Sequence, residues 1–186
     1  MIGSRKTSLW ALVTLIAGLI LALGLGGAGA GPLAEEQDAL SGSFQTTLLS
    51  PVADTTLNSW FPTTNYDSQW SLVLRSGDVA SPILQFDLSP ISGNQVTIAA
   101  ATLRLYVKSR TNAQSLTAAP AKVNRPWTAS QATWVKANST TNWAAAGCNS
   151  VPDDRDAHDP AAVVELPVAG WVEFDVTDMA RNWLAN

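Results

Sequence analysis

The sequence predicts an all-β fold, a jelly-roll β-sandwich that ends in one short helix. Three observations support this prediction. Short segments with alternating apolar and polar residues recur along the chain, turn residues (Gly, Pro, Asn and Ser) separate them, and the hydrophobic period changes once, near the C-terminus. Many short strands at such spacing are typical of sandwiches and jelly rolls.

The predicted strands are residues 44–49, 54–58, 70–75, 82–88, 101–108, 164–168 and 170–176. The longest, residues 101–108, has apolar residues at alternate positions, which favours one buried face. Its other face carries Arg104, Tyr106 and Lys108. Residues 137–160 lack such a pattern and are predicted to form a long polar loop, a feature that is often functional in compact domains.

A short amphipathic helix is predicted directly after the last strand. From Val176 to Leu184 the apolar residues follow helical spacing, so that one stripe faces the core. Thr177 or Asp175 is expected to cap this helix, and Asp178 suits the positive end of its dipole.

Residues 1–30 are predicted to form a signal peptide. Arg5 and Lys6 precede a long apolar run, and Ala28 and Ala30 give the small-residue pattern of a cleavage site. An uncleaved membrane anchor is the alternative, because the run approaches the ~20 residues that a spanning helix needs. Residues 31–43 are predicted to be a linker, and residues 44–186 a single domain outside the cytoplasm.

Charge and cysteine content limit the function classes. Without Arg5 and Lys6, 9 of the 11 basic residues remain against 15 acidic ones, a net charge of −6. Nucleic acids and anionic membranes recruit basic patches, so neither is an expected partner after removal of the leader. Cys148 is the only cysteine, which leaves it either buried or able to pair between molecules. The only histidine lies ten residues away in an acidic loop, so a Cys–His nucleophile is not expected.

Six motifs follow one another in the order of a known family: ADTT, FPTTNYD, ILQFDLS, ATLRLYV, RPWTASQATW and GWVEFDVTDMARNW. Together they resemble the DNRLRE domain, which is also classed as carbohydrate-binding module family 96. The resemblance implies a jelly-roll sandwich that is exported, non-catalytic and in some members able to bind polysaccharides, including acidic ones. The chain departs from the family at Ser81 and Gln85, where basic residues are usual, and at Asp67, where glycine is usual.

The resemblance also implies that the domain is incomplete. In the family the helix is normally followed by further strands that return to the sheet, and none follows here. We therefore expect the last strands to be missing and one sheet edge to be open, where a protein partner could add a strand.

Aromatic residues in polar loops are the candidate sugar-binding residues, since indole and phenol rings offer an apolar face and a polar tip. The candidates are Trp60, Tyr66 and Trp143 in loops, together with Arg104 and Tyr106 as one wall of a ligand groove. The other tryptophans of the domain divide into expected core residues (Trp127, Trp134 and Trp183) and two that the pattern leaves ambiguous (Trp70 and Trp171).

An acidic cluster lies in the long loop, formed by Asp153, Asp154, Asp156, His158 and Asp159. Such oxygen ligands suit Ca²⁺, but no D-x-D-x-D-G loop is present, and a solvated charged loop is the alternative. We expect no cofactor, and we predict no catalytic residue.

The leading functional hypothesis is a secreted, non-catalytic carbohydrate-binding or extracellular-matrix module, with a polysaccharide or the cell-surface matrix as partner. The alternatives are a cell-surface structural or protein-interaction domain, in which Cys148 or the open edge makes the contact, and an accessory domain of a polysaccharide-degrading enzyme. A polysaccharide-degrading activity of the chain itself is the remaining alternative.

Overall fold

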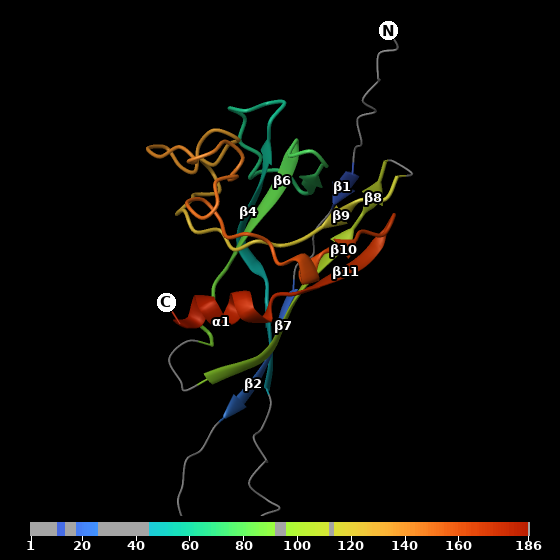
Figure 1. Ribbon diagram of the computed structural model, residues 1–186, viewed down its shortest axis with the longest axis vertical. Coiled ribbons are helices and arrows are strands. Elements are labelled where there is room, and N and C mark those ends of the chain that lie inside the picture. The colour runs from blue at the N-terminus through green and yellow to red at the C-terminus, as the bar shows by residue number, and fades with distance from the viewer. Residues whose placement is uncertain (1–10, 14–17, 26–44, 92–95, 112–113, 186) are drawn as a thin grey trace, which may run out of the picture.

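The computed structural model describes residues 11–13, 18–25, 45–91, 96–111 and 114–185 (Figure 1). Its strands are β1 (Ala11–Val13), β2 (Gly18–Leu25), β3 (Gln45–Leu49), β4 (Pro51–Asn58), β5 (Leu72–Leu74), β6 (Ala80–Phe86), β7 (Val96–Val107), β8 (Ser109–Arg110), β9 (Thr117–Ala118), β10 (Val164–Glu165) and β11 (Gly170–Asp175). One α-helix, α1 (Thr177–Ala185), follows β11, and a 3₁₀ turn spans Pro160–Ala162.

These strands form a four-stranded sheet in the order β11-β7-β2-β3, a three-stranded sheet in the order β5-β1-β8, and the pairs β4-β6 and β10-β9. The prediction of an all-β chain with one short C-terminal helix is confirmed. The jelly-roll strand order stays a prediction. Each of the seven predicted strands overlaps a strand of the structure, and residues 137–160 contain none of its named strands.

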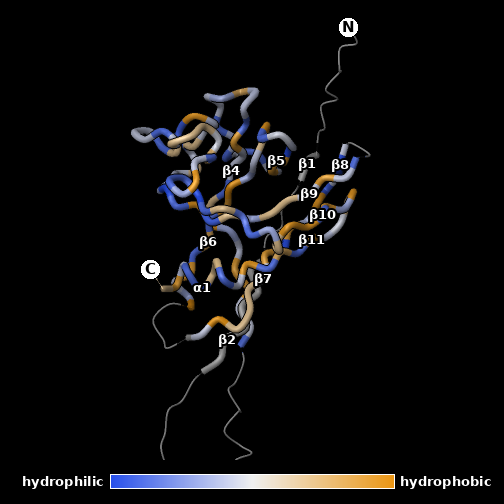
Figure 2. Tube along the Cα trace, viewed as in Figure 1, coloured by the Kyte–Doolittle hydropathy of each residue, from blue (hydrophilic) through white to orange (hydrophobic). Residues whose placement is uncertain are grey.

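The main core lies on one face of the β7–β11 ladder. Val172 and Phe174 of β11 stand opposite Leu105 and Leu103 of β7, and both β11 residues are buried. Because side chains alternate across a strand, the residues between them point to the other face. The core also contains Ile98, Ala101 and Val107 of β7 and apolar residues from other parts of the chain: Leu49, Ile91, Leu116, Leu166, Val176 and Ala180. Apolar and polar segments accordingly alternate along these strands in Figure 2.

The helix is fixed to β7 by hydrogen bonds from its N-terminal half. Asp175 accepts a hydrogen bond from the backbone N–H of Thr177, which confirms the predicted cap. The Thr177 hydroxyl oxygen accepts from the backbone N–H of Ala101, at 3.0 Å. One turn later, the Arg181 guanidinium donates to the carbonyl of Ile98, at 3.0 Å. These bonds hold α1 across β7, as Figure 1 shows.

The long loop region has a second core of its own beside β4 and β6 (Figure 1). Its buried members are Leu57, Ile83, Ala132, Ala137, Trp143 and Cys148, with Val123, Trp127 and Trp134 packed against them. Burial without regular strands requires other hydrogen-bond partners for the backbone. Asp154 provides several of them, as described below.

The N-terminal segment contributes β1 and β2, which were not predicted as strands. Most of residues 1–44 lie outside the described ranges, so the predicted signal peptide and linker stay predictions. Among the described residues, no helix is both long enough and apolar enough to cross a membrane.

Candidate functional site

The outer face of the β7–β11 ladder carries a cluster of aromatic and charged side chains. Register places Trp171 opposite Tyr106, and Glu173 opposite Arg104. The sequence dictates this arrangement, because Val172 and Phe174 turn into the core and their neighbours along β11 must therefore point outward. We call Trp70, Arg104, Tyr106, Lys108, Trp171 and Glu173 the aromatic face.

Trp171 lies at the centre of these contacts. Its ring meets Tyr106 edge-on, with ring centroids 5.2 Å apart and an interplanar angle of 74°. The Arg104 guanidinium carbon lies 4.7 Å from the centroid of the same ring. Arg104 also forms an ion pair with Glu173, with 2.7 Å between Nε and Oε1. Trp171 thus keeps a defined orientation although its side chain remains 47% exposed.

A second exposed tryptophan joins the aromatic face from the loop before β5. The Lys108 ammonium lies 3.5 Å from the ring centroid of Trp70, a distance typical of a cation–π contact. Trp70 is 67% exposed, the largest exposed fraction of any tryptophan among the exposed large hydrophobic residues. Lys108 lies two residues after Tyr106 in the chain, so Trp70 is connected to the aromatic face through Lys108.

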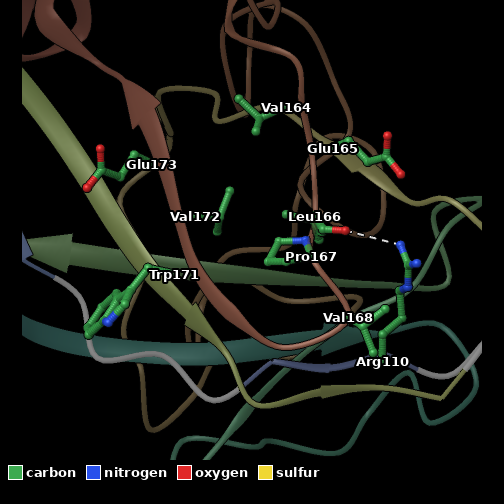
Figure 3. Close-up of a pocket in the computed structure, with 9 residues that line it drawn as sticks. All are labelled: Arg110, Val164, Glu165, Leu166, Pro167, Val168, Trp171, Val172 and Glu173. Carbon is green, nitrogen blue, oxygen red and sulfur yellow. Dashed lines mark hydrogen bonds between the residues drawn. The ribbon is translucent and has the colours of Figure 1, made fainter.

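An open groove adjoins this face where β10 turns into β11 (Figure 3). Its volume is about 700 Å³, and Leu166, Val168 and Val172 contribute to its apolar lining. Arg110 closes one side by donating a hydrogen bond of 3.1 Å to the Leu166 carbonyl. In Figure 3, Trp171 and Glu173 point away from Val172 across β11, so Trp171 lies where the groove and the aromatic face meet.

The five sequence-predicted binding residues fall into three places. Arg104 and Tyr106 lie together on the aromatic face. Trp60 is 42% exposed on the loop after β4, where the Arg75 guanidinium carbon lies 3.8 Å from its ring centroid. Tyr66, on the same loop, is half-buried; burial raises the pKa of its hydroxyl, and a hydrogen bond with Asn58 partly opposes that rise.

Trp143 requires a correction. It is only 5% exposed, and its indole N–H donates to the Thr133 carbonyl at 2.9 Å inside the second core. A ring that is covered on both faces cannot stack on a sugar, so we remove Trp143 from the candidate site. The polar residues around it in the sequence belong to the exposed side of a loop region that has its own apolar interior.

The acidic loop is organised by one buried carboxylate. Asp154 is fully buried, forms an ion pair with Arg125, and accepts backbone hydrogen bonds from Ala144, Ala145 and Ser150 at 2.8–3.2 Å. Burial alone would raise the pKa of Asp154, but these hydrogen bonds outweigh burial and hold the pKa below its usual value.

The other acids of this loop also have protein partners. Asp153 accepts from the Ser150 hydroxyl, Asp156 accepts from the Asn124 amide, and Asp159 caps the 3₁₀ turn. Within the ranges described above, no three His, Cys, Asp or Glu side chains are placed to hold a metal ion. The alternative of a calcium site in this loop therefore finds no support in the geometry.

Cys148 is buried in the second core at 3% exposure. Burial raises the pKa of its thiol to about 12, and the nearby negative charge of Asp154 adds to this effect. The thiolate is the reactive form of cysteine, so this thiol is inert at neutral pH. Cys148 is therefore not available to form the contact between molecules that the alternative of a protein-interaction domain requires.

We expect Cys148 to resist a thiol-specific reagent in the native protein and to react fully in guanidinium chloride. The measurement is the time course of modification at pH 7–8 with and without denaturant. A native-state reaction as fast as that of free cysteine would contradict the buried position.

The sequence left Trp171 and Trp70 ambiguous, and Glu173 was not among the predicted binding residues. The alternation along β11 already contained the signal for Trp171 and Glu173, since it places both on the face opposite the core. The position of Trp70 beside Lys108 depends on how a loop folds back over the sheet, and no local pattern in the sequence reports that.

The model of carbohydrate-binding module family 96 matches residues 45–186. No curated protein and no solved structure matches the chain. The match covers β3 through α1 and includes every residue of the aromatic face, whereas β1 and β2 lie outside it. Since the matched range is well over half of the chain, the resemblance seen in the six motifs is confirmed. The chain belongs to carbohydrate-binding module family 96.

Proposed function

We propose that this protein is a secreted, non-catalytic module that binds a polysaccharide through the aromatic face. The observation that carries the proposal is the pair of exposed tryptophans, Trp171 and Trp70, each with a cation over its ring that comes from β7 or from the residue directly after it. Exposed aromatic patches on soluble domains mark interaction sites. Rings that are fixed before binding also lose less conformational entropy when a ligand arrives.

The chemistry of the face suits a sugar chain. The C–H faces of pyranose rings can pack on indole, and the exposed rings of Trp171 and Trp70 offer more than one such contact. Arg104, Lys108 and Glu173 place charged hydrogen-bonding groups beside these rings. Such groups can orient hydroxyl or carboxylate substituents, while the aromatic area supplies most of the binding free energy.

The ion pairs and hydrogen bonds of the acidic side chains support a non-catalytic role. Glycoside hydrolysis uses two carboxyl groups that face each other across a cleft. Here Glu173 is paired with Arg104, Asp154 is buried in a hydrogen-bond network, and Asp87 accepts from Ser89. We therefore propose binding without bond cleavage, either by an independent matrix module or by an accessory domain of an enzyme.

Affinity gel electrophoresis of the full chain against neutral and acidic polysaccharides tests the proposal. We expect at least one polysaccharide to slow migration in proportion to its concentration, and soluble competitor to reverse the effect. Reducing ends are measured in the same mixtures, and their number should not increase. Unchanged migration on every polysaccharide would refute the binding function, and release of reducing ends by the purified chain would refute the non-catalytic role.

A further inference from the structure

The N-terminal segment lies between strands that do not pair with each other in the described part of the structure. In the four-stranded sheet, β2 separates β7 from β3, and in the three-stranded sheet β1 separates β5 from β8. Both neighbours of β2 run antiparallel to it. The segment is thus the inner strand of two sheets, and the family match includes the neighbouring strands but neither β1 nor β2.

The register of β2 matches the alternation in its sequence. Residues 18–25 read GLILALGL, with leucine at every second position. Leu19 and Leu21 stand opposite Leu103 and Ala101 of β7. A bulge after Ala22 shifts the pairing, so that Leu23 stands opposite the buried Ile98. Leu19, Leu21 and Leu23 therefore each stand opposite a residue that belongs to the main core or packs against it, and a one-residue slip would change all three pairings.

A tight turn does not impose this pairing. Residues 26–44 connect β2 to β3, whereas antiparallel neighbours joined in a hairpin usually have loops of 2–5 residues. β2 must therefore be held by its own ladders. Eight of its residues pair with β7 and five pair with β3. Without β2, the described part of β3 would have no ladder, and β7 would expose a row of backbone N–H and C=O groups.

We propose that the gap between β3 and β7 is a strand-acceptor site whose ligand is the segment Gly18–Leu25 of this chain. The segment that the sequence predicts as an export leader is then retained by the folded domain, where it completes the sheet. Loss of residues 1–30 opens the site, and the same segment supplied separately closes it again.

The test uses the full chain with a protease site inserted in residues 31–43. After cutting, we expect the fragment that carries β2 to co-elute with the larger fragment in size-exclusion chromatography. We also expect the unfolding temperature to stay within about 2 °C of that of the uncut chain. In a matched variant, Ile20→Pro and Ala22→Pro remove N–H donors from an inner strand, where each donor belongs to a ladder. This variant should release the fragment on cutting and, before cutting, should unfold at least about 5 °C lower.

The control variant carries two prolines in residues 26–44, which connect β2 to β3, as Ala34→Pro and Gln37→Pro. It should show the same co-elution after cutting and the same unfolding temperature as the wild type. The proline substitutions in β2 keep the segment apolar, so they separate strand pairing from unspecific adhesion of a hydrophobic peptide. The proposal is overturned if the wild-type fragment separates on cutting while the unfolding temperature of the remainder is unchanged. It is equally overturned if the Ile20→Pro, Ala22→Pro variant behaves as the wild type does.

Discussion

Replacing Asp154 by alanine should lower the free energy of unfolding by about 3–5 kcal/mol, because it leaves the Arg125 charge without its buried partner. The substitution also removes the acceptor of three backbone N–H groups. Those bonds hold the loop that covers the second core, so loss of packing adds to the loss of polar contacts. Urea unfolding of the full chain measures the change.

The matched control is Asp153→Ala, one residue earlier. Asp153 is exposed and accepts from the Ser150 hydroxyl at the surface, so its loss should change stability by no more than about 0.5 kcal/mol. Equal destabilisation by both substitutions would show that the buried network around Asp154 does not organise the loop.

Because folding lowers the pKa of the Asp154 carboxylate, the stability of the protein should depend on pH. The pKa of Asp154 is lower in the folded protein than in the unfolded chain, so its contribution to stability is present above the unfolded value of ~3.9. That contribution is lost as pH falls through the lower folded pKa. Between pH 5 and pH 3 the free energy of unfolding should fall further in the wild type than in Asp154→Ala. If it falls equally in both proteins, the pKa of Asp154 is not lowered by folding.

Replacing Trp171 by alanine should weaken polysaccharide binding by about 10- to 30-fold, since buried tryptophan contacts at binding sites are worth about 1.4–2 kcal/mol or more. Trp171 is the shared contact of Tyr106 and Arg104, so its loss also removes a ring contact from both of these side chains. Affinity electrophoresis at a series of polysaccharide concentrations gives the ratio of dissociation constants.

Trp60→Ala is the matched control for this prediction. Trp60 has nearly the same exposure as Trp171 and a cation over its ring, but that cation is Arg75, which does not belong to the aromatic face. Binding by this variant should remain within about twofold of the wild type. If Trp60→Ala abolishes binding and Trp171→Ala does not, the binding surface is centred on Trp60 and not on the aromatic face.

Period-two alternation identified the strands that have one buried face. β6 and β11 were predicted close to their observed bounds because of their alternation, whereas β7 begins at Val96, five residues before the predicted strand. The two-residue strands β8 and β9 are too short to show a period. β2 was not predicted, because an apolar run with no polar alternation is typical of a leader or a membrane segment as much as of an inner strand.

The candidate site was partly predictable for a related reason. Arg104 and Tyr106 follow from the alternation of β7 alone, and Trp171 follows from that of β11. The contact between Tyr106 and Trp171 depends on a pairing register between strands more than sixty residues apart. Trp143 was misplaced because loop polarity does not reveal that residues 123–148 enclose an apolar interior.

A ¹H–¹⁵N NMR titration tests most directly whether the aromatic face binds sugar, because each tryptophan indole N–H gives its own signal. The chain has eight tryptophans, whose signals can be assigned from single Trp→Phe variants. An oligosaccharide of the polysaccharide that binds should shift the signals of Trp171 and Trp70 and leave that of the buried Trp143 in place. Shifts confined to Trp60, with Trp171 and Trp70 unchanged at saturation, would contradict the account.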